Sequence, residues 1–73
     1  MKKIHINTPY ITLGQLLKFS SLVSSGGETK MFLEMHTIYV NDTLENRRGK
    51  KCFPGDVVKI VDVDEIEIEG QIL

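Results

Sequence analysis

The chain has 73 residues, which is enough for one small domain and too short for a second. It is 41% hydrophobic and 26% charged, like an ordinary soluble domain, and no apolar run is long enough to span a bilayer. A single cysteine excludes an internal disulfide. We therefore expect a cytoplasmic protein that does not bind membranes, folds as one domain over residues 1–73 and is a monomer.

The net charge of −1 conceals an uneven distribution along the chain. Residues 62–73 hold five acidic residues and no Lys or Arg, which leaves nine basic and five acidic residues over residues 1–61. The local balance there is +4, which suits an anionic partner. The asymmetry predicts a basic face and an acidic region at the opposite end of the molecule.

The first predicted elements are a strand and a helix. Residues 2–7 alternate, with Ile4 and Ile6 facing inward, which is typical of a half-buried strand. A helix should begin at Thr12, because Thr12 and Gln15 have the spacing of a capping box. The inward stripe of this helix is expected to hold the apolar residues Leu13, Leu16 and Leu17, continued by Phe19 or by Leu22 and Val23.

A second helix is predicted to follow two serines and two glycines. Ser25 and Glu28 again have capping-box spacing, and Gly26 and Gly27 would let a partner approach the backbone closely. A helix N-terminus also offers unpaired N–H groups to an anion, although an ordinary turn between helices would look the same. The core residues expected from this helix are Phe32, Leu33 and either Met31 or Met35.

The second half of the chain reads as β structure. The predicted features are a strand with Ile38 and Val40 inward, turns at Asn41-Asp42, Pro54-Gly55 and Asp64-Glu65, a strand within residues 57–63, and an alternating strand over 65–69. Outward glutamates in the last strand would discourage pairing along an edge of the sheet. The expected fold is α+β, with two short helices packed on a small, mostly antiparallel sheet.

The most unusual stretch is Arg47-Arg48-Gly49-Lys50-Lys51, which holds four of the nine basic residues in five positions. Turn chemistry does not explain this composition. Gly49 is expected to let the loop bend sharply, so that four cations face one surface, as in proteins that bind phosphate backbones. A solvated hairpin loop that only keeps the protein soluble is the alternative.

The sequence shows no catalytic set, no metal-ligand spacing and no phosphate-binding glycine loop of the Walker type. Cys52 has no His or second Cys nearby and is expected to be an inert thiol. We therefore expect no enzyme activity, cofactor or metal.

Five short motifs follow one another in an order that resembles a known RNA-binding family. They are Leu16-Leu17-Lys18, Ser25-Gly26-Gly27 with Lys30, Ile38 to Asn41, the basic run, and Pro54-Gly55-Asp56-Val57-Val58. In this order they resemble the S-four domain, or αL motif, and within it the stand-alone bacterial YaaA-like branch. The resemblance covers about residues 10–61.

The resemblance implies a protein that binds structured RNA without catalysis, chiefly ribosomal RNA or a ribosome-assembly particle. The RNA-contacting positions that it implies are Ser25, Gly26, Gly27, Lys30, Asn41, Arg47, Arg48, Lys50 and Lys51, with Lys18 as an addition. The chain departs from the family at His36-Thr37 and Asp42, where many members have glycine, and Asp42 adds a negative charge beside the surface.

Two other classes of protein fit parts of the pattern. A β-grasp sulfur carrier has a similar length and similar strand motifs, but its chemistry needs a carboxyl-terminal Gly-Gly, and this sequence reads Glu69 to Leu73 there. A protein-interaction adaptor would use the same basic loop to dock on an acidic partner. Salt-dependent affinity for RNA would distinguish the S-four reading from the adaptor.

Overall fold

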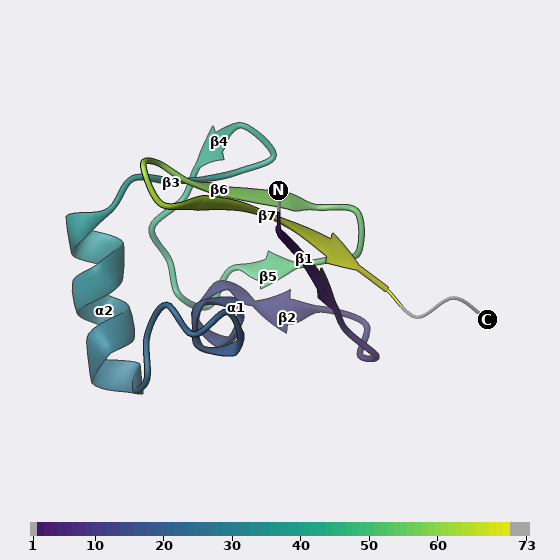
Figure 1. Ribbon diagram of the computed structural model, residues 1–73, viewed down its shortest axis with the longest axis horizontal. Coiled ribbons are helices and arrows are strands. Elements are labelled where there is room, and N and C mark those ends of the chain that lie inside the picture. The colour runs from purple at the N-terminus through teal and green to yellow at the C-terminus, as the bar shows by residue number, and fades with distance from the viewer. Residues whose placement is uncertain (1, 71–73) are drawn as a thin grey trace.

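The computed structural model describes residues 2–70 and confirms the α+β fold (Figure 1). Its elements are β1 (Lys2–His5), β2 (Ile11–Thr12), α1 (Leu13–Phe19), α2 (Gly26–Met35), β3 (Ile38–Val40), β4 (Thr43–Leu44), β5 (Lys51–Cys52), β6 (Val57–Ile60) and β7 (Asp64–Glu69). Residues 71–73, which entered the comparison with a sulfur carrier, lie outside the described residues. Neither helix is long and apolar enough to cross a membrane within residues 2–70.

The strands form two sheets that are joined through the helices and loops. The larger sheet has the order β1-β7-β6-β3-β4, in which only the β1–β7 pair is parallel. The smaller sheet is the antiparallel pair β2–β5. Figure 1 shows α1 and the small sheet below the large sheet, with α2 standing at one end.

The core lies between α1 and the near face of the large sheet. The fully buried side chains come from α1, β3, β5, β6 and β7: Leu13, Leu16, Leu17, Ile38, Cys52, Val58, Ile60, Ile66 and Ile68. Because successive side chains of a β-strand point to opposite faces, the residues that alternate with these isoleucines and valines along each strand point away from α1. The far face therefore carries the polar residues of β6 and β7.

The predicted start of α1 is confirmed. The Thr12 hydroxyl accepts from the Gln15 amide at 3.3 Å, and the Gln15 side chain accepts from the Thr12 amide at 3.1 Å. The helix ends at Phe19, whose ring is 61% exposed, so Phe19 does not continue the inward stripe. Val23 is buried and Leu22 packs against the core from the segment that follows the helix.

In α2 the prediction of an inward methionine is wrong. Leu33 is buried and Phe32 packs against the core, whereas Met31 and Met35 are largely exposed. The Phe32 ring instead stacks on His36 at a centroid distance of 4.1 Å. The helix stands at the end of the sheet, so only a narrow strip of its surface meets the core.

The two tight turns around β3 and β6 are confirmed. Asn41 and Asp42 both have left-handed backbone angles, with φ values of 50° and 67°, which is the geometry of a two-residue β3–β4 hairpin. Gly55 has a φ of 95°, and the Asp56 amide donates to the Phe53 carbonyl at 2.9 Å across the second turn. That φ explains the glycine at position 55.

The predicted turn at Asp64-Glu65 is wrong. The chain turns over residues 61–63, where Asp62 has a φ of 64°, and Asp64 already belongs to β7. β7 lies between β1 and β6, so its glutamates do not protect an edge. In the strand register, Glu65 instead lies opposite Lys59 and Glu67 lies opposite Lys3, on the face of the sheet away from α1.

Candidate nucleic-acid interface

The basic loop, residues 45–51, is anchored to the first turn of α1 by its backbone. The Lys50 carbonyl accepts from the Leu13 amide at 2.8 Å, and the Arg48 carbonyl accepts from the Gly14 amide at 2.9 Å. The loop joins β4 of the large sheet to β5 of the small sheet, so it is not a hairpin between two paired strands. The loop carbonyls occupy N–H groups of α1 that a helix N-terminus would otherwise leave unpaired.

Gly14 allows this close contact between loop and helix. A Cβ at position 14 would lie 3.4 Å from the Arg48 Cβ and carbonyl oxygen, and 3.4 Å from the Thr29 Cγ2 of α2. The missing side chain therefore brings α1, α2 and the loop together at one point. Gly49 has no comparable role, because its φ is not left-handed and a Cβ there would meet open space.

Glu45 organises the start of the basic loop and was missed in the sequence analysis. Its side chain, 9% exposed, accepts from Arg47 Nε at 2.9 Å and from Arg47 Nη2 at 3.1 Å. It also accepts from the backbone amides of Asn46 and Arg47, each at 3.1 Å. The hydrogen bonds from the Arg47 side chain are the main reason that the pKa of Glu45 falls from 4.5 to about 2.

The Glu45–Arg47 pair changes the number of free charges in the loop. Arg47 remains 73% exposed, but its guanidinium is held by a carboxylate in the fork arrangement that arginine favours. Of the four cations in the basic run, Arg47 is thus partly neutralised within the protein. The Glu45–Arg47 contact is the only ion pair within residues 2–70, so Arg48, Lys50 and Lys51 remain available to an external anion.

The N-terminus of α2 is open to a partner. Ser25 is the N-cap, and its hydroxyl accepts from the Glu28 amide at 3.4 Å. The reciprocal half of the predicted capping box is absent, because the Glu28 carboxylate accepts from the amide and hydroxyl of Ser24 instead. Gly26 and Gly27 begin the helix, and a Cβ would meet no atom within 4 Å at Gly26 and only the Ser25 hydroxyl at 4.0 Å at Gly27.

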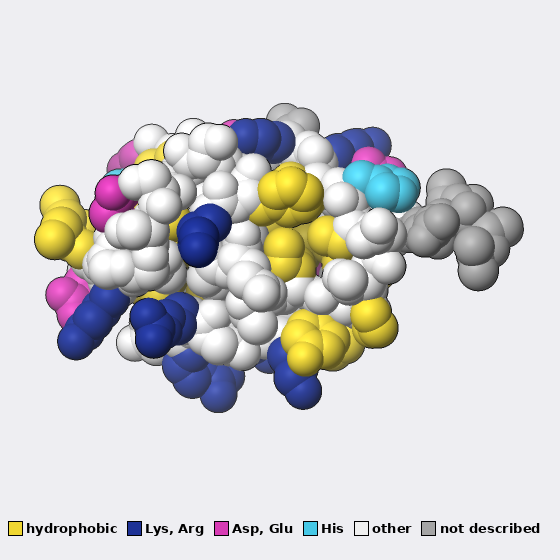
Figure 2. Space-filling view, turned by 90° about the horizontal axis from the view of Figure 1, so that it is seen from below, with side chains coloured by type: hydrophobic (Ala, Val, Ile, Leu, Met, Phe, Trp, Pro, Cys, Tyr) yellow, Lys and Arg dark blue, Asp and Glu magenta, His cyan; other side chains and the backbone are white. Residues whose placement is uncertain are grey.

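Lys30 of α2 and Arg48 of the basic loop lie on the same shallow hollow. Asn46, Leu33 and Glu34 complete its lining. Two motifs that are separated by about a quarter of the chain thus contribute cations to one site. Figure 2 views the molecule from below, and several of the Lys and Arg side chains on this face gather along the lower edge of the view.

The remaining predicted residues lie around this centre. Arg47, Lys50 and Lys51 line a neighbouring hollow with Gly49 and Phe53. Lys18 lines a separate groove, between α1 and the segment that connects β1 to β2. The surface is therefore broad, with Lys30 and Arg48 near α2 and the two lysines of the loop nearer the small sheet.

The Asn41 side chain has a structural role in the turn between β3 and β4. Its Nδ2 donates to Asp56 Oδ1 at 2.9 Å, and its Oδ1 accepts from the Val57 amide at 2.9 Å. These bonds tie the hairpin to the Pro54-Gly55 turn. The predicted contact of Asn41 with RNA stays a prediction, but the fold already accounts for the residue.

Aromatic residues adjoin the basic loop. Lys51 Nζ lies 5.0 Å from the centroid of the Tyr10 ring, and Tyr10 contacts Phe53 at a centroid distance of 5.8 Å. A cation over an aromatic face is a favourable electrostatic arrangement. The signal in the sequence was Phe53 directly after the basic run and Tyr10 in the segment before α1.

The described residues show no arrangement for metal chemistry. No group of three or more His, Cys, Asp or Glu side chains within residues 2–70 is placed to hold a metal ion. Cys52 is buried, and burial raises the pKa of its thiol to about 11, so it is held as an unreactive thiol.

Comparisons with known proteins identify the family of the chain. A family model described as "S4 domain" matches residues 4–69. The chain belongs to the S4 domain family. The S4 assignment confirms the resemblance inferred from the five motifs, and it leaves the sulfur-carrier alternative without support. A role in RNA binding follows from membership of this family.

One curated protein is 53% identical over 57 residues, which cover 78% of this chain and 80% of the relative. It comes from Bacillus subtilis (strain 168) and is described as "Probable ribosome maturation protein RlbA". The similarity therefore extends over most of both chains.

Proposed function

We propose that this protein binds structured RNA, ribosomal RNA or a ribosome-assembly particle, as a non-catalytic factor in the cytoplasm. The contact surface that we propose combines the N-terminus of α2 with the basic loop. The observation that carries the proposal is the shared hollow of Lys30 and Arg48 beside the open glycines of α2. The printed name of the Bacillus subtilis relative supports a ribosomal target.

The geometry suits an RNA backbone for two reasons. Helix N-termini bind phosphate oxygens through unpaired N–H groups, and Gly26 and Gly27 leave that approach free of side chains. Arg48 shares a hollow with Lys30 of α2, and Lys50 and Lys51 continue the cationic surface toward the small sheet, so the charges are spread over a broad surface rather than a pocket. Double-stranded RNA is recognised mainly by shape and by such backbone contacts.

The charge distribution orients the protein on its target. The sheet face away from α1 carries the glutamates of β7, and Lys3 and Lys59 lie opposite two of them. That face would be repelled by an RNA backbone, whereas the α1 side would be attracted. The protein should therefore approach RNA with the helices and the basic loop first.

The direct test is the affinity of the wild-type protein for folded ribosomal RNA fragments and for ribosomal precursor particles, over a range of salt. Each neutralised phosphate should contribute roughly −0.7 to −0.9 to the slope of log affinity against log salt. A slope of several units, together with co-sedimentation with a particle, supports the proposal. Negligible binding to every RNA and particle at low salt would contradict it and favour a protein-interaction adaptor.

A further inference from the structure

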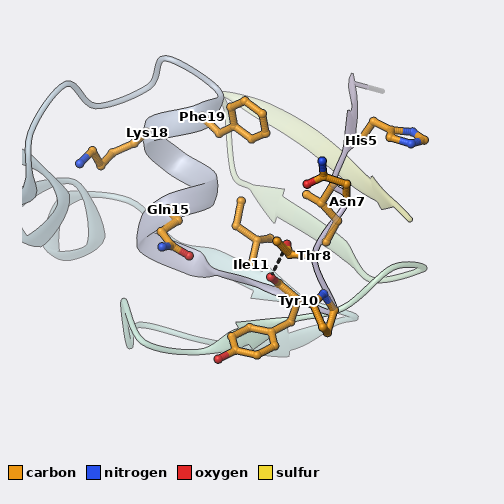
Figure 3. Close-up of a pocket in the computed structure, with 10 residues that line it drawn as sticks. His5, Asn7, Thr8, Tyr10, Ile11, Gln15, Lys18 and Phe19 are labelled. Atoms are coloured by element: carbon orange, nitrogen blue, oxygen red, sulfur yellow. Dashed lines mark hydrogen bonds between the residues drawn. The ribbon is translucent and has the colours of Figure 1, made fainter. Parts of the chain in front are cut away.

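A groove runs between α1 and the segment that connects β1 to β2, beside the proposed RNA surface (Figure 3). Its base is apolar, since Ile6 and Ile11 are buried side chains that line it. Figure 3 shows Phe19 projecting from the end of α1 toward the stretch of chain that carries His5 and Asn7, with Ile11 between Phe19 and Tyr10. The groove is therefore an open slot with aromatic residues at both ends.

The exposure of the aromatic side chains on this side is not explained by folding. The chain has five aromatic residues, and three of them are exposed: Phe19 at 61%, Phe53 at 47% and Tyr10 at 38%. Tyr10 and Phe19 line the groove, and Phe53 contacts Tyr10. Exposed apolar side chains that gather in one place mark a binding surface more often than single ones do.

Cations flank the groove and are continuous with the proposed RNA surface. Lys18 lines the groove, and Lys51 of the basic loop lies over the Tyr10 ring at its other end. An occupant with a flat apolar body and negative charges on either side would satisfy both the aromatic residues and the lysines. An unpaired nucleotide has this chemistry, because its base stacks on aromatic rings while its neighbouring phosphates bind cations.

The rim of the groove can also supply hydrogen bonds to a base. The Gln15 side chain uses its Oε1 to accept from the Thr12 amide, so its NH₂ group remains able to donate. The Thr8 hydroxyl donates to the Tyr10 carbonyl at 2.9 Å, which shapes the loop and leaves the hydroxyl oxygen able to accept. Both residues line the groove.

We propose that this groove binds an unpaired nucleobase of the RNA, with Phe19 as the stacking side chain and Lys18 and Lys51 beside the flanking phosphates. The proposal rests on the proposed RNA-binding function and adds a subsite to it. Backbone contacts by the basic loop would then position the protein, and the groove would select RNA in which a base is free to leave the helix.

The test uses two RNA duplexes that differ only by one bulged 2-aminopurine, which reports stacking by a change in fluorescence. Wild-type protein at low salt should bind the bulged duplex more tightly than the paired one and change the fluorescence of the bulged base. Phe19→Ala should lose this preference, with affinity for the bulged duplex about 5- to 150-fold weaker. Its salt slope should match the wild type, because no phosphate contact is removed.

Two control variants test the specificity of the effect. Phe19→Trp should keep the preference, since it retains an aromatic face. Met35→Ala removes an exposed apolar side chain of α2 that does not line the groove, and it should leave both affinities unchanged. Far-ultraviolet circular dichroism checks that each variant is folded.

The outcomes separate this inference from the function on which it rests. Equal wild-type affinity for both duplexes would overturn the groove as a base site while RNA binding stands. An unchanged fluorescence response in Phe19→Ala would overturn the role of Phe19. Absence of binding to either duplex at low salt would contradict the proposed function itself.

Discussion

The backbone amide of Gly14 donates to the carbonyl oxygen of Arg48 at 2.9 Å, which joins the first turn of α1 to the middle of the basic loop. Thr29 Cγ2 of α2 lies 3.4 Å from the position that a Cβ of the same glycine would take. One residue without a side chain therefore sets the position of Arg48 relative to α2. The proposed RNA surface depends on this packing, because its cations come from both elements.

Gly14→Val should destabilise the fold. The added Cβ would already be in contact with Arg48 and Thr29 at 3.4 Å, so the two further methyl groups of valine would overpack the site, a change that costs about 1–3 kcal/mol in well-packed regions. Urea denaturation of the two proteins measures the difference in unfolding free energy. Gly49→Ala is the matched control and should be as stable as the wild type or more so, because its Cβ meets open space. Wild-type stability in Gly14→Val would contradict the close packing.

Glu45 should make the stability of the protein depend on pH in the acid range. Its pKa is lowered from 4.5 to about 2 in the folded state, so the stabilisation is complete above pH 4.5 and is lost as the pH falls toward 2. Glu45→Gln removes the titrating group. The stability difference between the two proteins should be largest near neutral pH and shrink over this window.

Chemical denaturation at a series of pH values gives the required free energies for the wild type and for Glu45→Gln. The second carboxylate with a lowered pKa, Glu28, is present in both proteins, and its contribution cancels in the comparison. A difference that stays constant from neutral pH down to about 2 would show that the Arg47 pair does not stabilise ionised Glu45.

Gly26→Ala should separate stability from RNA affinity. The new Cβ has no protein atom within 4 Å, and alanine is up to about 1 kcal/mol more favourable than glycine in a helix. The variant should therefore be equally or more stable in thermal denaturation. It should also bind RNA more weakly in fluorescence anisotropy, because the methyl group lies where the phosphate would approach. Unchanged affinity would remove Gly26 from the interface.

Asn41→Gly should act on stability rather than on binding. Glycine keeps the left-handed backbone angle at this turn but removes the two side-chain hydrogen bonds to Asp56 and Val57. The expected loss is about 1–2 kcal/mol of unfolding free energy, with RNA affinity close to that of the wild type. The reverse result, full stability with weakened RNA binding, would make Asn41 an RNA contact as the family resemblance implied.

Local signals in the sequence predicted much of the fold. The Thr12–Gln15 capping box and the Asn41-Asp42 and Pro54-Gly55 turns have short-range causes, and all three appear in the structure. The turn at residues 61–63 was missed because Asp62 adopts a left-handed angle without a glycine or proline to mark it. Met31 and Met35 are exposed because α2 lies at the end of the sheet, and the position of a helix in the fold cannot be predicted from helical periodicity.

The candidate site was predictable in its residues but not in its arrangement. The basic run and the two-glycine start of α2 were recognisable from their composition. The order of motifs shared with the S4 family then assigned both to one RNA-binding surface. The β2–β5 pair that anchors the loop consists of strands of two residues each, which are too short to show a period. The aromatic groove was hidden because it arises from contacts between segments, whereas the Glu45–Arg47 bond is local but lies in irregular backbone that shows no periodic pattern.

The most direct test of the central claim compares two double variants with the same change in net charge. Lys30→Gln/Arg48→Gln removes one cation from each half of the proposed surface, whereas Lys3→Gln/Lys59→Gln removes two from the opposite face. We predict that only the first pair reduces the salt slope of RNA binding, by roughly 1.4 to 1.8 for two lost phosphate contacts. Equal loss of affinity and of salt slope in both variants would show that RNA binding depends only on the net charge of the protein. That result would contradict an interface formed by α2 and the basic loop.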